Sequence, residues 1–464
     1  MMRTFTRMSL GLVLLGVSSP LWSQTDPSAA TGSAGTSETT ANGPMVAPAP
    51  VSGEGYSMEF ASETPRTNYL RGGLIFGTAY DDDVVSVSSQ AASDVSYSIS
   101  PTISFDQTRS RFRWNLSYSP GFTFYQKYSS LNQSNQNVAT KFSYRLSPHV
   151  TFSAQEAFSK SLGGYVGPCE IGTGGSCGAL QSPNTSIVAP ATDTLNDSSS
   201  AQITYQFSPG GMVGVTGNFS ELRYPDQGDV PGLHGSSATG GSAYYTHRLS
   251  GKHYIGATYQ YQKYLTHSDG VVTLVGPATL TQSLMLFYTL YLQRSLSLSV
   301  FGGPQYSDTY GGLCTLPGCT ALMVPPVRSW SPGGGGSFNW QGQRNAAIAN
   351  FARKISDGGG LQGAVTFTSA DASVHHRFSP VFSGTVGADY SVNKVLAAGA
   401  SDGNGGHSIS GTVTLQRTFG EHFNATLGYL RLHQSYDIQA ISSVPNRNRV
   451  WFSIGYQFER ALGR

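Results

Sequence analysis

The chain ends with RVWFSIGYQFERALGR (residues 449–464), in which apolar and polar residues alternate. Every second side chain is apolar: Val450, Phe452, Ile454, Tyr456 and Phe458. A period of two residues indicates an extended strand with one apolar and one polar face. A soluble β-sandwich would bury the apolar face in its core, whereas an outer-membrane barrel would turn it toward lipid. The rest of the sequence has to decide between these two classes.

The composition favours the barrel. Charged residues make up 12% of the chain, about half of what is usual for a soluble protein. The sequence also contains 56 Gly, 25 Tyr and 23 Phe, which suits an outer surface in hydrocarbon with aromatic side chains at both membrane interfaces. The net charge of +2 gives no reason to expect a nucleic-acid partner.

The N-terminus has the pattern of a secretory signal peptide. Arg3 and Arg7 precede an apolar run over residues 8–17, which is too short to span a bilayer. We predict a signal peptide over residues 1–23, with cleavage after Ser23 or, less favourably, Ser19. Residues 24–66 are rich in Ala, Ser, Thr, Gly and Pro, so we expect a flexible periplasmic leader. Residues 67–464 would then form the barrel.

Beyond residue 67, alternating segments come in pairs that are joined by very short polar turns and separated by longer connections. This asymmetry is typical of barrels with short periplasmic turns and long extracellular loops. The sequence predicts an all-β, transmembrane antiparallel up-and-down β-barrel of about 18 strands. The weakest pair is FNWQ with NAAIANFARKIS, because residues 346–354 could instead form a short helix and leave 16 strands. Either number would leave room for an aqueous channel.

Two resemblances follow from these segments. The terminal strand resembles the C-terminal signature of Gram-negative outer-membrane barrels, with Phe458 as the terminal aromatic residue, although ERALGR follows it here. This resemblance implies a membrane insertion signal read by the barrel assembly machinery, comprising Phe452, Ile454, Tyr456 and Phe458. In addition, YSPGFTFYQKYSSLNQSNQNVATKFSYRLS (residues 118–147) resembles barrels encoded beside exopolysaccharide export systems.

The four cysteines form two closely spaced pairs, each inside one long predicted extracellular loop: Cys169 with Cys177, and Cys314 with Cys319. Neither segment supplies the additional His or Cys that a metal site would need. In an oxidising compartment, two disulfides within the loops are the favoured interpretation.

Two further motifs are candidate sites. Asp371, His375 and His376 could indicate a hydrolase, but adjacent histidines on a strand point to opposite faces, so they cannot share one site. The run SPGGGGS (residues 331–337) lacks the lysine and the following helix of a phosphate loop, and we interpret it as a flexible loop or the start of a strand. We therefore expect no catalytic residues, no metal and no cofactor.

Basic residues occur at positions where the alternation predicts a lumenal side chain: Arg111, Arg113, Lys141, Arg145, Arg248 and Arg449. They could simply be solvated or paired with acidic residues, or they could give a mildly basic lumen that favours anions or acidic saccharides. We expect Arg111, Arg113, Arg145 and Arg449 in the periplasmic half of the barrel.

The sequence thus predicts a porin-like channel of the bacterial outer membrane for passive diffusion of small hydrophilic solutes or saccharides, without enzymatic activity. The alternative is an accessory barrel of an exopolysaccharide secretion assembly. Expected partners are outer-membrane lipid, the barrel assembly machinery, and either further copies of the chain or a periplasmic secretion partner.

Overall fold

The structure is a computed structural model that describes residues 67–84, 92–162, 184, 192–225, 233–267, 274–275, 278–293, 295–310, 313–314, 326–396, 405–436 and 446–462. Among these residues, no helix is long and apolar enough to cross a membrane. The predicted signal peptide and leader lie outside the described residues. So do Cys169, Cys177 and Cys319, and the side chain of Cys314 is not described either.

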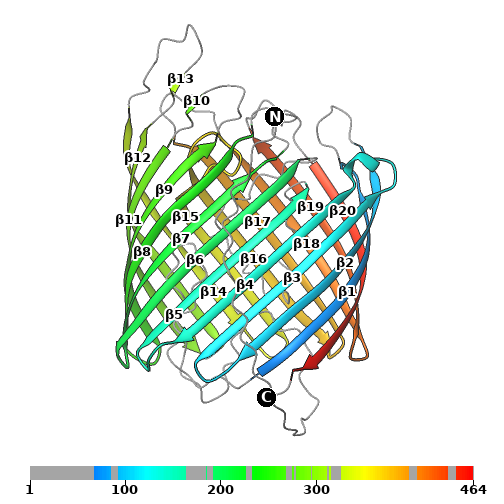
Figure 1. The fold of residues 1–464 in the computed structure, drawn as a ribbon, viewed down its shortest axis with the longest axis horizontal. Helices are drawn as coiled ribbons and strands as arrows, with labels where there is room; N and C mark the ends of the chain where they lie inside the picture. The colour runs from blue at the N-terminus through cyan, green and yellow to red at the C-terminus, as the bar shows by residue number, and fades with distance from the viewer. Residues whose placement is uncertain are drawn as a thin grey trace, which may run out of the picture.

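One closed antiparallel sheet of 18 strands forms the wall of a barrel (Figure 1). Its strands are β1 (Thr67–Asp81), β2 (Asp94–Thr108), β3 (Phe112–Tyr125), β4 (Gln133–Arg145), β5 (Val150–Leu162), β6 (Asp193–Ser208), β7 (Gly211–Arg223), β8 (Gly235–Arg248), β9 (His253–His267), β11 (Ala278–Gln293), β12 (Leu296–Tyr310), β14 (Val327–Gln341), β15 (Asn345–Ser356), β16 (Val365–Ser379), β17 (Phe382–Val395), β18 (Gly405–Phe419), β19 (Phe423–Tyr436) and β20 (Asn446–Ala461). The short strands β10 (Leu274–Val275) and β13 (Leu313–Cys314) pair with each other, and one 3-10 turn covers Ser129–Leu131.

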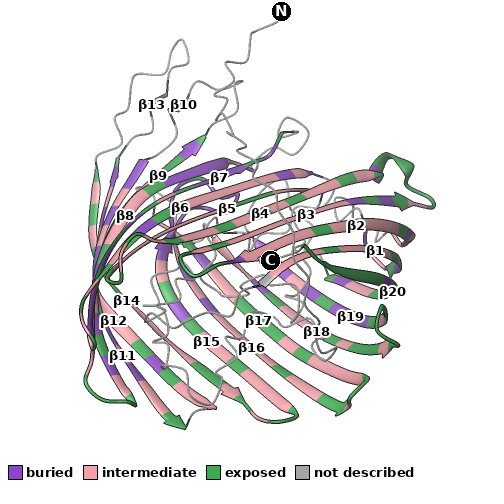
Figure 2. Cartoon of the chain, turned by 60° about the horizontal axis from the view of Figure 1, so that its bottom comes forward, coloured by how far each residue is buried: buried purple, intermediate pink, exposed green. Residues whose placement is uncertain are grey.

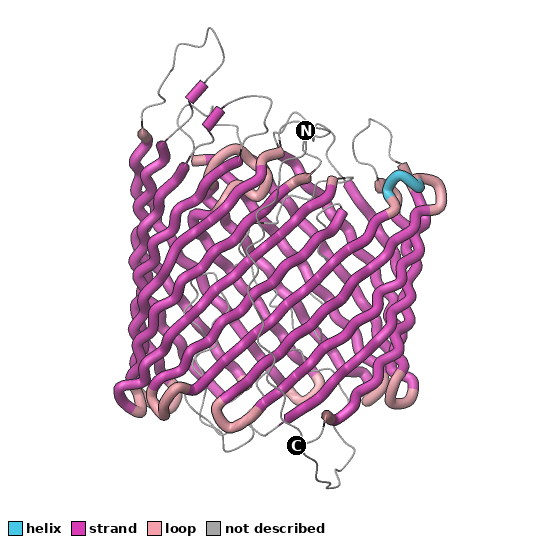
Figure 3. Tube along the Cα trace, in the orientation of Figure 1, coloured by secondary structure: helices cyan, strands magenta, loops and turns pink. Residues whose placement is uncertain are grey.

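Consecutive wall strands are neighbours, and β20 closes the barrel against β1, with Tyr80 opposite Val450 and Gly72 opposite Phe458. One end of the barrel, which we call the turn end, has tight turns such as the one between Thr108 and Phe112. At the other end, the loop end, most consecutive strands are separated by more residues. Figure 3 shows the short turns at the turn end. The predicted barrel of 18 strands is confirmed.

The β1–β20 seam is held by charged side chains near both ends. Near the turn end, Arg71 Nε lies 2.7 Å from Glu459 Oε2. Near the loop end, Arg447 pairs with Asp81, and both side chains are almost fully buried. The closing strand is therefore fixed by ion pairs as well as by its backbone ladder.

The outer face of the wall is apolar, as the alternation predicts. Val215 and Leu286 are 64% and 62% exposed on this face, and the alternate residues of β20, from Val450 to Phe458, are also exposed there. Buried residues alternate with less buried residues along much of β9 (Figure 2). An exterior this rich in exposed large apolar side chains is suited to hydrocarbon rather than water.

The doubtful pair consists of two strands, β14 and β15, so the helix considered for residues 346–354 is wrong. The glycine run at 331–337 lies inside β14 and is not a loop. A Cβ atom at Gly303 would collide with the carbonyl oxygen of Leu284, and one at Gly335 with that of Phe351. The wall therefore turns a tight corner over β12, where β11 and β14 also contact each other, and only glycine leaves room for it.

Several other glycines lie directly opposite an aromatic residue on the next strand. Trp451 is paired with Gly428, and Phe287 with Gly256. In each pair the ring occupies the space that a side chain at the glycine would need. Aromatic rings laid over glycine in this way cover the exposed backbone and reduce the space taken up inside the barrel.

Candidate functional site

The interior of the barrel has two unlike sides. On the first side, the inner faces of β2–β5, which we call the open wall, carry small polar and basic side chains. β2 alone contributes a row of hydroxyls: Ser96, Ser98, Ser100, Thr102, Ser104 and Thr108. On β4, Asn137, Ala139 and Lys141 point inward and are nevertheless exposed. Solvent therefore reaches the open wall from inside the barrel.

The predicted basic residues lie on or near this inner surface. Arg113 and Lys141 are exposed on the inner faces of β3 and β4, near the turn end, and Arg145 ends β4. Arg111 lies in the turn between β2 and β3. Arg248 ends β8, on the other side of the barrel, where its Nε donates to the carbonyl oxygen of Ser250 at 3.3 Å.

The expectation that Arg449 lies in the periplasmic half is wrong. In the backbone ladder between β1 and β20, Arg449 lies opposite Asp81, close to the loop end. The reason is strand direction, because β20 runs from the loop end to the turn end and Arg449 is close to its start. The six basic residues therefore do not form one arc at one height of the barrel.

The second side of the interior is the packed wall, which we define as the inner faces of β7, β8, β9, β11 and β12. Three of its aromatic residues form a buried cluster with Met212: Tyr244, Tyr254 and Phe287. Hydroxyl pairs cross-link neighbouring strands, with Thr289 Oγ1 2.9 Å from Ser299 Oγ and Thr279 Oγ1 3.1 Å from Thr309 Oγ1. These buried hydroxyls thus satisfy each other across the wall, as most buried polar groups do.

A hairpin narrows the barrel at the loop end. Residues 357–364, which we call the hairpin tip, join β15 to β16, and all of them except Gln362 are buried. Gly359, Gly360 and Gly363 adopt positive φ values of 60°, 112° and 98°, which residues with a Cβ rarely adopt. These glycines let the tip bend away from the wall and into the interior.

The hairpin is attached to strands far away in the barrel order. Hydrogen bonds link it to the packed wall and the β7–β8 connection: Tyr264 Oη to Ile355 O (3.0 Å), Gly363 N to Thr266 Oγ1 (3.1 Å), His234 N to Gly360 O (2.9 Å) and Tyr224 Oη to Gly359 O (3.3 Å). Since β7–β9 are not neighbours of β15 or β16, these bonds span the interior.

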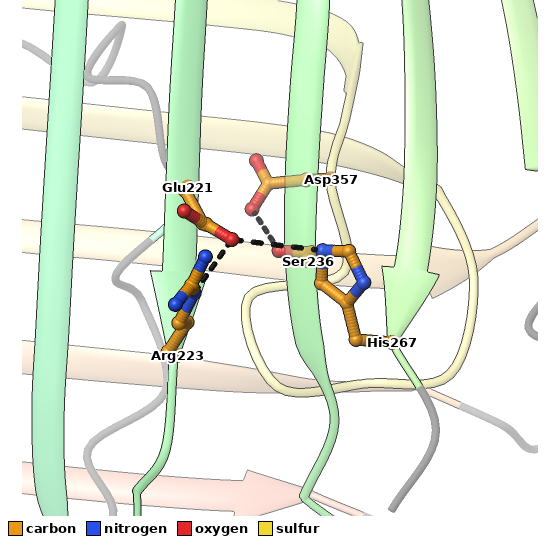
Figure 4. A network of polar contacts seen from close by, with 5 residues as sticks. All are labelled: Glu221, Arg223, Ser236, His267 and Asp357. Carbon is orange, nitrogen blue, oxygen red and sulfur yellow. Dashed lines mark hydrogen bonds and ion pairs between the residues drawn. The ribbon is translucent and has the colours of Figure 1, made fainter. Parts of the chain in front are cut away.

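Asp357 is the polar centre of this attachment. Its side chain is buried, with 1% exposed. Oδ1 accepts hydrogen bonds from Asn184 N and Ser356 Oγ, both at 3.0 Å, and Oδ2 accepts one from Ser236 Oγ at 2.9 Å. Figure 4 shows Asp357 reaching Ser236 on β8. A carboxylate with three donors inside the protein is well satisfied despite its burial.

On β7 and β9, close to this attachment, Figure 4 also shows a charged group. Glu221 Oε1 lies 2.6 Å from Arg223 Nε and 3.9 Å from His267 Nε2. The side chains of Arg223 and His267 are exposed, so water screens their contacts with Glu221. Such contacts contribute little to stability.

Apolar packing reinforces the polar attachment. Leu222, Tyr224 and Leu233 from the β7–β8 region form one buried cluster with Leu361 and Val365 from the hairpin. Burial, together with the nearby Asp357 carboxylate, raises the pKa of the Tyr224 phenol. Tyr224 therefore remains protonated and can donate to Gly359. The hairpin is consequently a fixed constriction rather than a loose loop.

The residues considered for catalysis do not converge. His375 points into the barrel, with Nδ1 3.1 Å from Thr385 Oγ1, whereas His376 lies on the outer face beside Phe378. Asp371 Oδ2 accepts a hydrogen bond from Asn350 Nδ2 at 2.8 Å. Within the described ranges, no group of three or more His, Cys, Asp or Glu residues could hold a metal ion.

Sequence reasoning missed the hairpin, although a signal was present. The segment DGGGLQG (residues 357–363) lies between two strands at the loop end and contains four glycines and one acidic residue. It is also much shorter than loop-end connections such as the one from Leu162 to Asp193. Its length alone does not distinguish it, because the connection between β3 and β4 (residues 126–132) is shorter. Its consecutive glycines indicate a tight bend but not where the bend packs.

No protein-family model and no curated protein sequence matches the chain. Among solved structures it is similar to OccK2 (OpdF) of Pseudomonas aeruginosa, with 10% identity, a TM-score of 0.42, and coverage of 84% of this chain and 98% of that chain. It is also similar to OccAB4 of Acinetobacter baumannii (9%, 0.40, 85% and 98%) and to the FrpB iron transporter from Neisseria meningitidis (9%, 0.41, 83% and 81%).

Proposed function

We propose that this chain is a porin-like channel of the bacterial outer membrane through which small hydrophilic solutes, saccharides among them, diffuse passively. The observation that carries the proposal is the solvent-exposed inner surface of the open wall, where Asn137 and Lys141 point inward yet remain exposed. A barrel filled by its own side chains would bury such residues. An 18-stranded wall encloses more space than its own side chains need.

The outward face supports placement in the outer membrane. Its exposed aliphatic and aromatic side chains match a hydrocarbon environment, and a closed barrel leaves no unpaired strand edge. We assign the turn end to the periplasm and the loop end to the exterior, since short periplasmic turns and long external loops are general in such barrels.

The mechanism follows from the two sides of the interior. Solutes would pass along the open wall, where hydroxyl and amide groups replace part of their hydration shell at little cost. The hairpin tip, anchored to the packed wall, would set the size limit at the external mouth. No chemical step is involved, and we expect no enzymatic activity.

Planar bilayers test this function. The purified full-length chain should open stable, ohmic channels whose conductance rises with salt concentration. A second candidate, the accessory barrel of an exopolysaccharide secretion assembly, rests only on the weaker sequence resemblance. It would be favoured if the isolated chain remained silent until a periplasmic partner was added, and that result would overturn the channel proposal.

A further inference from the structure

Trp451 is unusual among the tryptophans of the described residues. Trp114, Trp330 and Trp340 occupy positions at which the side chains of their strands point outward. Trp451, in contrast, alternates with outward Val450 and Phe452 on β20 and so points into the barrel. Its side chain remains partly exposed. An indole with one side open to a polar lumen presents apolar surface to water, which is unfavourable unless something covers it.

The wall around Trp451 is flat. Its neighbours across the two ladders are Gly428 on β19 and Ala79 on β1. The six-membered ring of the indole occupies the position of a missing side chain at Gly428, since a Cβ there would lie within 2.6 Å of three ring atoms. The indole therefore leans on the wall, with one side against backbone and the other toward the lumen.

Serine hydroxyl groups lie beside this surface. Ser453 lies two residues further along β20 and points to the same side as Trp451. On the next strands, Gly77 is opposite Ser453 and Ser98 is opposite Gly77, while Ser96 is opposite Ala79. On the turn-end side of the indole, the inward residues Gly77, Ser98 and Ser453 are small and partly exposed, which leaves space there and supplies hydroxyl groups at its edge. On the loop-end side, Ala79 and Ser96 are buried, and Arg449 points inward two residues before Trp451.

From this arrangement we infer that Trp451 is a stacking platform for pyranose rings that pass along the open wall. The face of an indole is electron-rich, and the C–H groups on one face of a pyranose carry partial positive charge, so the two pack together. The sugar hydroxyls at the ring edge can bond to Ser98 and Ser453, which are both partly exposed. This combination of an apolar surface with a few polar groups is what small-molecule sites generally provide. The inference rests on the proposed channel function.

The alternative is purely structural, in which the ring only covers the backbone at Gly428. The two roles are separable with maltose, which contains pyranose rings, and mannitol, an acyclic polyol without a ring face. In bilayers, maltose should reduce the current of the unmodified channel in a saturable way, and mannitol at equal concentration should not. Trp451→Leu should weaken the maltose effect about tenfold, measured as the fraction of that variant's own open-channel current that maltose blocks.

Trp451→Phe keeps an aromatic ring over Gly428 and should retain part of the maltose effect. Trp330→Leu, which changes an outward tryptophan, should leave the effect unchanged. Three results would contradict the proposal that Trp451 binds pyranose rings. Maltose could block the unmodified channel and Trp451→Leu equally, maltose and mannitol could block equally, or maltose could fail to block an open channel. Failure of the channel itself would look different, because the unmodified chain would then pass no current at all.

Discussion

The inner faces of β4 and β11 are built on the same alternation but behave in opposite ways. On β4 the inward residues include Asn137 and Lys141, which are exposed. On β11 the inward residues from Thr279 to Thr289 are all buried. The difference lies in chemistry and curvature: β11 carries no inward charge and adjoins the tight glycine corner at β12 and β14, whereas β4 carries long, solvated side chains. Alternation therefore fixes which way a residue points but not whether it meets water.

The largest expected effect comes from placing a charge on each wall. Thr289 is 1% exposed and bonded to Ser299, so Thr289→Arg should destabilise the barrel by about 3–5 kcal/mol through an unpaired buried charge. Asn137→Arg on the open wall should change stability by less than about 1 kcal/mol. Urea unfolding in lipid vesicles, followed by tryptophan fluorescence, measures both changes.

Leu286→Arg provides a reference on the lipid-facing side. Leu286 is 62% exposed on the outer face, where an arginine near the bilayer midplane costs about 2–4 kcal/mol. Similar losses for Thr289→Arg and Asn137→Arg would show that the two walls do not differ.

A smaller effect should follow from loosening the hairpin. Asp357→Ala leaves the donors of Asn184, Ser236 and Ser356 without their acceptor, at a cost of about 1–3 kcal/mol. Because this attachment holds the hairpin tip across the mouth, the variant should show a higher or more variable single-channel current. Asp106→Ala removes the same charge from the inner face of β2 and serves as the control, with steady openings expected. Unchanged current in Asp357→Ala would mean that the tip does not limit flow.

The smallest effect concerns ion preference. Arg113 and Lys141 are exposed on the open wall, but exposed charges are screened over about 8 Å at physiological salt. We expect weak anion selectivity that fades as salt rises, and a shift toward cations when Arg111, Arg113 and Arg145 are all changed to Gln. Reversal potentials in a salt gradient measure this shift. The control is Arg248→Gln, at the end of β8 on the packed wall, which should shift the reversal potential less. An equal shift would mean that the basic residues of the open wall have no special influence on ion selectivity.

Strand number and facing were predictable because a period of two residues is imposed by the strand itself. The inward direction of Arg113, Lys141 and Arg145 follows from Phe112 and Tyr144 as their apolar neighbours. The position of Arg449 along the barrel axis was predicted wrongly. Assigning it requires the direction in which the strand runs as well as the alternation of its side chains. For residues 346–354, the weak alternation could not exclude a helix, because small residues such as Ala346 and Ala347 fit both a helix and a strand.

The constriction could not be derived from local pattern. The contact of Asp357 with Ser236 joins residues 121 positions apart, and no periodicity links such segments. The packed wall did leave a trace in the sequence, since the inward positions of β9, β11 and β12 carry no charged residue. An uncharged inner face over consecutive strands predicts packing rather than an aqueous lining.

Accessibility from the aqueous lumen tests the difference between the two walls most directly. Asn137→Cys and Thr289→Cys place a thiol on the open and the packed wall, and a small charged methanethiosulfonate reagent is added while the current through single channels is recorded. The unmodified chain, treated in the same way, controls for its own cysteines. The current should fall promptly in Asn137→Cys and remain unchanged in Thr289→Cys. An equal fall in both variants, or a fall in Thr289→Cys alone, would contradict a channel that runs along the open wall.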